Sequence, residues 1–195
     1  MSSIGVMLDA NVLFPASLRD ILLYTASMDL YRLYLTEDII EETCRNLVHR
    51  GRMNNVAASR LSTAIRKYFP EAFVTGYHDL IPSMTNQEKD GHVLAVAVRA
   101  GAQLIVTNNL KDFPITSLAP FAIEAQSPDD FLVYLYHFDS DGVAKALVQQ
   151  VNNLRNPDRT LPEVLDTLAQ HVPTFVNHVR SLFSVKTYSW PKERL

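Results

Sequence analysis

Short apolar runs, separated by longer stretches with helical spacing, recur along the first two thirds of the chain. Four of these runs have the length and the β-branched or aromatic content of buried strands. They are Ile4–Leu8, Tyr31–Leu35, Leu104–Val106 and Phe121–Gln126, and Val74–Leu80 is a weaker strand candidate. The pattern therefore predicts a sheet of short strands.

Between these runs, apolar residues recur at intervals of three and four, which is typical of amphipathic helices. One helix is predicted from Pro15 to about Met28, because proline suits a first helical turn. A second begins after Thr36 as N-cap and continues through IIEETCRNLVHR. Asn54–Tyr68 and Asn86–Ala100 are the next two, and Gly101 marks the end of the latter.

Strands that alternate with helices of this length favour βαβ units, and hence a mainly parallel sheet covered on both faces. In such sheets ligands bind outside the carboxyl ends of the strands. Asp9 follows the first strand candidate, and Thr107, Asn108, Asn109 and Asp112 follow the third. We therefore expect a functional site at this edge of the sheet.

The pattern becomes wholly helical after Gln126. Ser127 and the residues after it favour a helix start, and successive helices are predicted over 131–138, 143–154 and roughly 162–183. Asn156-Pro157 and Val172-Pro173 interrupt them. The sequence predicts two parts: an α/β domain over 1–126 and a helical extension over 127–195.

Composition adds few constraints. The chain has 195 residues, of which 47% are hydrophobic and 20% are charged, as expected of a globular protein. One cysteine, Cys44, excludes an intramolecular disulfide and a cysteine-based zinc site. Asp9 interrupts the apolar N-terminal run, and no stretch reaches the length of a membrane span. We expect a cytoplasmic protein with no membrane contact.

The net charge of −3 gives no general attraction for polyanions, but one segment is locally basic. From Thr43 to Pro70 there is no aspartate or glutamate. The basic residues there are Arg45, Arg50, Arg52, Arg60, Arg66 and Lys67. The segment is either a solvated helical face or a surface for phosphates or a partner, and Arg50, Arg52, Arg60 and Lys67 are candidate phosphate contacts.

Four acids are candidate site residues, namely Asp9, Glu42, Asp90 and Asp112. Each also has an ordinary structural interpretation, such as a helix cap, a turn or a surface ion pair. Together, acids at strand ends and helix starts along one sheet edge are what Mg²⁺ or Mn²⁺ requires. Such a site serves phosphoryl chemistry. His92 is either a ligand, a donor to one, or a polar residue at a helix start.

The choice between two neighbouring glutamates depends on the helix faces. Glu41 lies four residues before Arg45, the spacing of a routine surface pair. Glu42 lies closer to the apolar edge that Ile39, Thr43 and Leu47 define. We therefore prefer Glu42 as the functional residue.

Four motifs, in this order and spacing, resemble PIN-domain ribonucleases, and in particular VapC-like toxins of bacterial toxin–antitoxin pairs. They are LDANVLFP with Asp9, TEDIIEETCRNL with Glu42, KDGHVLAVAVRAGAQLIVT with Asp90, and TNNLKDFP with Asp112. The resemblance covers residues 4 to about 126. It implies a three-layer α/β/α PIN fold and an endoribonuclease that depends on Mg²⁺ or Mn²⁺.

The resemblance also implies roles for residues. The four acids hold the metal or its waters, Thr107 and Asn109 match polar positions that complete the site, and Asn11 is a possible support. A metal-bound water would attack and leave a 5′ phosphate. The chain departs from the family in two ways: its fourth acid comes later after the threonine than in many members, and its helical tail exceeds a minimal toxin.

Implied partners are an RNA substrate, a small antitoxin protein and a second copy of the chain in a homodimer. Two other functions remain open. One is a non-catalytic PIN-fold scaffold or RNA-binding module. The other is a haloacid-dehalogenase-like phosphatase, which normally has a second aspartate where this chain has Asn11.

Overall fold

The structure is a computed structural model that describes residues 4–154 and 159–185. Its strands are β1 (Gly5–Leu8), β2 (Arg32–Tyr34), β3 (Leu104–Val106) and β4 (Glu124–Gln126). Its first α-helices are α1 (Ala10–Leu13), α2 (Ala16–Ser27), α3 (Glu37–His49), α4 (Asn55–Tyr68), α5 (Gly91–Ala100) and α6 (Ile115–Leu118). The later ones are α7 (Pro128–Phe138), α8 (Ser140–Asn153), α9 (Leu161–Leu168) and α10 (Pro173–Val185).

Within the described residues the sheet has the order β2-β1-β3-β4, and all its pairs are parallel. The register places Leu8 of β1 beside Val106 of β3. The two central strands, β1 and β3, are fully buried. Because β1 and β3 end side by side, the residues that directly follow the two strands lie next to each other at the carboxyl edge of the sheet.

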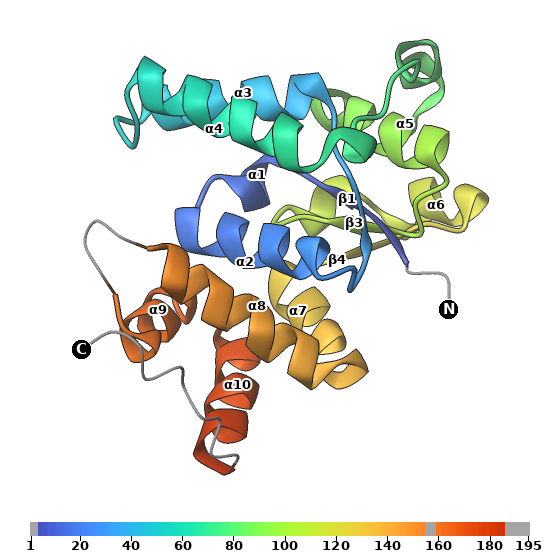
Figure 1. Cartoon of the computed structure of the whole chain (residues 1–195). Coiled ribbons are helices and arrows are strands. Elements are labelled where there is room, and N and C mark those ends of the chain that lie inside the picture. The colour runs from blue at the N-terminus through green and yellow to red at the C-terminus, as the bar shows by residue number, and fades with distance from the viewer. Residues whose placement is uncertain (1–3, 155–158, 186–195) are drawn as a thin grey trace.

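Helices cover both faces of the sheet (Figure 1). Helices α3, α4 and α5 lie on one side of the strands, and α2 and α7 lie on the other. The apolar side of α5 packs on β1 and β3, and its C-terminus is closed by Gly101 in the left-handed conformation at φ 65°. The fold is therefore the three-layer α/β/α arrangement that the sequence predicts.

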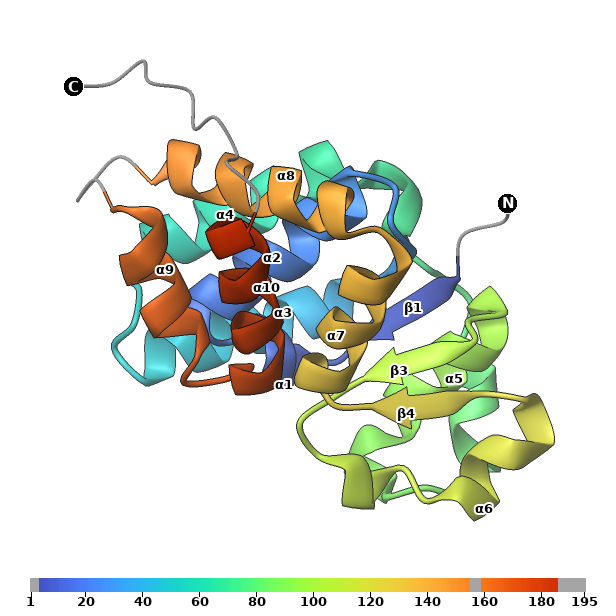
Figure 2. The same cartoon turned by 90° about the horizontal axis from the view of Figure 1, so that it is seen from below.

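The C-terminal helices pack directly on the α/β layers, as the view from below shows (Figure 2). Helix α8 lies against α2, and α10 lies against α7. Asn153 Nδ2 donates to Tyr24 Oη at 2.9 Å, and the carboxylate of Asp129 accepts from the backbone N–H groups at the start of α10. Buried side chains of both parts form one hydrophobic core. The boundary at residue 126 stays a prediction.

Most predicted elements are confirmed within a few residues. Thr36 Oγ1 accepts from the N–H of Ile39 at 3.1 Å and caps α3, as expected. Ser127 Oγ accepts from Asp130 N–H at 3.1 Å and caps α7. Pro173 begins α10, so the predicted interruption there is confirmed. The interruption at 156–157 lies outside the described residues.

Two predicted elements are wrong in part. Val74–Leu80 is not a strand: Phe73 forms a bridge to Leu35, after which Gly76 turns the chain at φ 70° and a 3-10 helix begins at His78. The predicted helix Asn86–Ala100 begins late, at Gly91. Its first residues form a 3-10 turn, because Gln87 N–H donates to the carbonyl oxygen of Asp112 at 3.3 Å.

No α-helix among the described residues is long and apolar enough to span a bilayer.

Candidate active site at the carboxyl ends of the strands

Asp9 and Thr107 are the first residues after the two central strands. The register that pairs Leu8 with Val106 brings them side by side. Asp9 N–H donates to the carbonyl oxygen of Val106 at 3.1 Å and extends the strand pairing by one residue. Thr107 Oγ1 donates to Asp9 Oδ2 at 2.7 Å. Strand pairing and this hydrogen bond therefore hold the Asp9 carboxylate in one orientation.

Asn11 supports the same carboxylate from the first turn of α1. Its Nδ2 donates to Asp9 Oδ2 and, at 2.9 Å, to Thr107 Oγ1. Its Oδ1 accepts from the N–H of Asn108 at 2.9 Å. Asn109 donates its backbone N–H to Thr107 Oγ1 at 3.0 Å. Asn11 thus joins the ends of β1 and β3, and Asn109 contributes to this network through its backbone.

The Asp9 carboxyl is buried close to two other acids. Asp9 is 5% exposed, and burial raises the pKa of its carboxyl above the usual value. The negative charges of Asp90 and Glu42 raise this pKa further, whereas the Thr107 hydrogen bond opposes the shift. The pKa of Asp9 therefore reflects first its burial and then a cluster of like charges, built from the end of β1, the body of α3 and the start of α5.

The two neighbouring glutamates of α3 face different surroundings. Glu42 Oε2 lies 4.0 Å from His92 Nε2, next to the start of α5. Glu41 is exposed and lines a groove between α3 and α4, together with Arg45 and Arg66. Proximity to Asp9 thus favours Glu42, although its role stays a prediction.

Asp90 and Asp112 meet around one ammonium group. Lys89 Nζ lies 3.0 Å from Asp112 Oδ2 and 3.5 Å from Asp90 Oδ2. The ammonium of Lys89 lowers the pKa of Asp112. Burial raises the pKa of Asp90, with Lys89 opposing and the charge of Asp112 adding to the shift. The Gln87 contact described above anchors this turn to the loop after β3, so the late fourth acid still reaches the cluster.

The donor set has the chemistry of a Mg²⁺ or Mn²⁺ site. Its donors are carboxylate oxygens, and Asp90 Oδ2 is buried with no hydrogen-bond partner among the described residues. Across the same residues, however, no three acids, histidines or cysteines are already spaced to hold a metal. In this structure Lys89 supplies the positive charge between Asp90 and Asp112.

The four candidate RNA contacts do not form one surface. Arg50 ends α3 and lies over the Phe14 ring, with its guanidinium carbon 5.6 Å from the ring centroid. Arg52 lines a pocket between the loop after α3 and the C-terminal helices. Arg60 and Lys67 are exposed on α4. RNA binding by these residues stays a prediction, and their separation favours Arg50 and Arg52, which lie near Phe14 and the pocket, over Arg60 and Lys67.

Lys89 is the residue of this cluster that the sequence did not single out. It directly precedes Asp90, but a lysine beside an aspartate is a common surface pattern. Its position depends on the 3-10 turn that replaces the first helical turn. That turn arises from a contact with a loop more than twenty residues away, and no local pattern predicts it.

Comparisons with known proteins agree with this architecture. Residues 128–181, which span α7 to α9 and the first part of α10, match the family model described as VapC50 C-terminal domain. The chain is also 41% identical, over 125 residues, to a protein of Mycobacterium tuberculosis (strain ATCC 25618 / H37Rv) named "Putative ribonuclease VapC50". The alignment covers 64% of this chain and 74% of that protein. No solved structure matches the chain. The chain therefore belongs to the VapC-like family of PIN-domain toxins.

Proposed function

We propose that this protein is a metal-dependent endoribonuclease that acts as the toxin of a toxin–antitoxin pair. The observation that carries the proposal is the convergence of Asp9, Glu42, Asp90 and Asp112 at one edge of the sheet. The charges of Asp90 and Glu42 raise the pKa of Asp9, the charge of Asp112 raises that of Asp90, and Lys89 contacts both Asp90 and Asp112, all of which supports this convergence. The relative from Mycobacterium tuberculosis, named "Putative ribonuclease VapC50", supports the chemistry.

In this proposal the four acids hold Mg²⁺ or Mn²⁺. When bound, such an ion neutralises charge on the attacked phosphodiester and lowers the pKa of a water. Hard carboxylate oxygens match either ion.

The chain's own residues prepare this site. Thr107 and Asn11 hold the Asp9 carboxylate in one orientation, so its ligand oxygen needs no rearrangement. Burial of Asp9 and Asp112 excludes bulk water from part of the cluster. Lys89 has a side chain that is 63% exposed, so it can leave the two aspartates without breaking the core. No serine, cysteine or lysine nucleophile is required: water would attack phosphorus in line with the departing 3′ oxygen, and cleavage would leave a 5′ phosphate and a 3′ hydroxyl.

The proposed substrate is RNA, and the proposed partners are a small antitoxin protein and a second copy of the chain. A cytoplasmic location remains a prediction from the sequence. Two alternatives are weaker. A non-catalytic scaffold has no need to keep mutually repelling acids together. A haloacid-dehalogenase-like phosphatase needs an acid where Asn11 instead joins two strand ends.

The test is RNA cleavage by the purified protein, with Mg²⁺ or Mn²⁺ and with excess chelator, followed by mapping of the end groups. Glu42→Gln should abolish cleavage, whereas the adjacent Glu41→Gln is the matched control and should retain it. Cleavage that persists in chelator would refute the metal requirement. Equal activities of the two variants would remove Glu42 from the site. A protein that neither binds Mn²⁺ nor cleaves RNA would fit the scaffold.

A further inference from the structure

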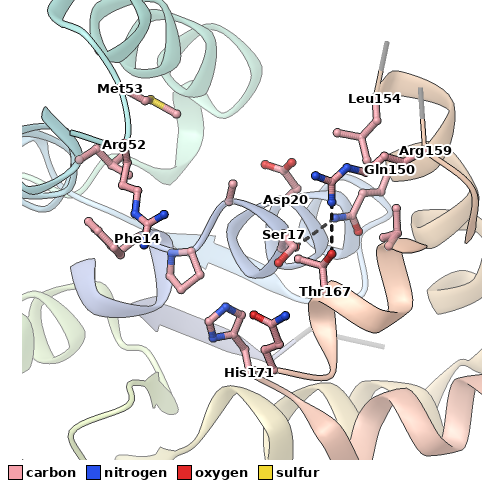
Figure 3. Close-up of a pocket in the computed structure, with 15 residues that line it drawn as sticks. Phe14, Ser17, Asp20, Arg52, Met53, Gln150, Leu154, Arg159, Thr167 and His171 are labelled. Atoms are coloured by element: carbon pink, nitrogen blue, oxygen red, sulfur yellow. Dashed lines mark hydrogen bonds between the residues drawn. The ribbon is translucent and has the colours of Figure 1, made fainter. Parts of the chain in front are cut away.

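A pocket of about 520 Å³ lies where the α/β layers meet the C-terminal helices (Figure 3). Phe14 and Arg52 line one side of it, and α8 and α9 form the other. Ser17 and Asp20 of α2 lie between them. Neither the proposed reaction nor the packing of the core uses this pocket.

The pocket contains a buried acceptor without a partner. Gln150 is 1% exposed, and its Nε2 donates to the carbonyl oxygen of Ser17 at 3.0 Å. Its Oε1 is buried and has no hydrogen-bond partner among the described residues. Leaving such an acceptor unpaired costs free energy, and a ligand that donates a hydrogen bond removes this cost. Asp20 adds a carboxylate, which likewise only accepts.

Cationic side chains surround these acceptors. Arg52 and Arg159 line the pocket, together with His171, and all three are exposed. Two permanent positive charges favour a phosphate group and disfavour an arginine or lysine of a protein partner. The occupant should therefore combine a negative charge with hydrogen-bond donors, and a nucleotide has both.

The pocket is close to the candidate active site. Asp9 directly precedes α1 and Phe14 directly follows it. The five-residue separation corresponds to about 8 Å along a helix axis. A nucleotide held against Phe14 can thus belong to the same RNA strand whose phosphodiester lies at Asp9. Proteins that read single-stranded RNA commonly hold an unstacked base against an aromatic ring and bind its polar edge.

From this juxtaposition we infer that the pocket is a nucleotide subsite that selects guanine near the cleaved bond. The guanine edge presents N1–H and N2–H₂ side by side, which suits the Asp20 carboxylate and Gln150 Oε1. Uracil presents one N–H between two carbonyl oxygens and leaves an acceptor unpaired. Phe14 supplies the aromatic wall, and Arg52 and Arg159 receive the phosphate. The inference rests on the proposed RNA substrate, and it assigns the C-terminal helices a role in sequence selection.

The test is calorimetric titration of the full chain with the 5′-monophosphates of guanosine, adenosine, cytidine and uridine, in chelator. The guanosine nucleotide should bind at least about fivefold more tightly than the uridine nucleotide, the size of one well-placed base contact. Asp20→Asn and Gln150→Leu should each weaken binding of the guanosine nucleotide by about fivefold or more. Gln149→Leu, on the exposed side of the same helix, is the matched control and should change nothing.

Thermal melts of each variant establish that it is folded. Equal affinities for the four nucleotides would overturn the inference. It would also be overturned if neither Asp20→Asn nor Gln150→Leu changed the affinity for the guanosine nucleotide. Tighter binding of acetyl-arginine amide than of any nucleotide would overturn it in favour of a protein partner. The titration involves neither metal nor cleavage. Nucleotide binding without ribonuclease activity would therefore refute the proposed function and still support the subsite. Cleavage of RNA without nucleotide binding would support the proposed function and refute the subsite.

Discussion

Lys89 Nζ lies 3.0 Å from Asp112 Oδ2, so the acidic cluster contains a cation that belongs to the chain. The lysine side chain is largely exposed and long enough to leave, whereas Asp112 is buried and fixed. In the proposed function, the ammonium and a divalent ion therefore compete for the same carboxylates. The lysine keeps the metal-free site from being an assembly of unpaired like charges.

Replacing Lys89 by methionine should tighten Mn²⁺ binding and destabilise the metal-free protein. The variant keeps the length of the side chain but removes the competing charge, and it leaves Asp90 and Asp112 to repel each other. Calorimetry with Mn²⁺ and no RNA measures the first effect, and melting in chelator measures the second. Lys111→Met is the control, because it removes a charge from the same loop without the short contact to Asp112. Unchanged Mn²⁺ affinity in Lys89→Met would show that the lysine and the metal do not compete.

Asp9→Asn should separate catalysis from stability. The change keeps the shape of the side chain but removes one charge from a cluster that raises the Asp9 pKa. We expect no RNA cleavage and, in chelator, a Tm equal to or above that of the parent. Each kcal/mol of relieved repulsion corresponds to about 2–4 °C for a chain of this size. Mn²⁺ should raise the Tm of the parent and leave the Tm of the variant nearly unchanged. A large loss of Tm in chelator would instead make Asp9 a structural cap.

Arg50 and Arg52 should contact RNA phosphates, because Arg50 lies over Phe14 and Arg52 lines the pocket close to the site. Changing either to glutamine should flatten the salt dependence of RNA affinity by about 0.7 in the log–log slope. Arg60→Gln and Lys67→Gln, on the separate surface of α4, are the matched comparison and should leave the slope unchanged. A slope change for the α4 variants alone would move the RNA path to that helix.

Asp20 should make stability fall as pH rises. Burial raises its pKa in the folded protein above the usual value of an aspartate, and the charge of Arg19 only partly opposes the shift. An acid whose folded pKa is raised contributes stability below its unfolded pKa, and this contribution is lost as pH rises through the folded pKa. Asp20→Asn should therefore gain Tm relative to the parent as pH increases from about 4 to 7. A Tm difference that is constant over this range would exclude the linkage.

The sequence predicts the strands and the positions that follow them well, because buried parallel strands carry a local signal. The Asp9 and Thr107 neighbourhood follows directly from strands that end in register. The strand predicted at 74–80 fails because apolar content does not reveal the turn at Gly76. The late start of α5 and the place of Lys89 depend on the Gln87–Asp112 contact. No local sequence pattern predicts the pocket, because Ser17 and Gln150 are 133 positions apart.

The separation of Ser17 and Gln150 also affects when the two helices can pack during translation. Helix α2 emerges early, but the helix that covers it contains Gln150 and emerges 133 residues later. At a typical rate of translation this interval is on the order of 10 s. Throughout it, the apolar side of α2 has no α8 to cover it and is available to chaperones. The nuclease layers and the pocket can reach their final packing only after the last third of the chain has been made.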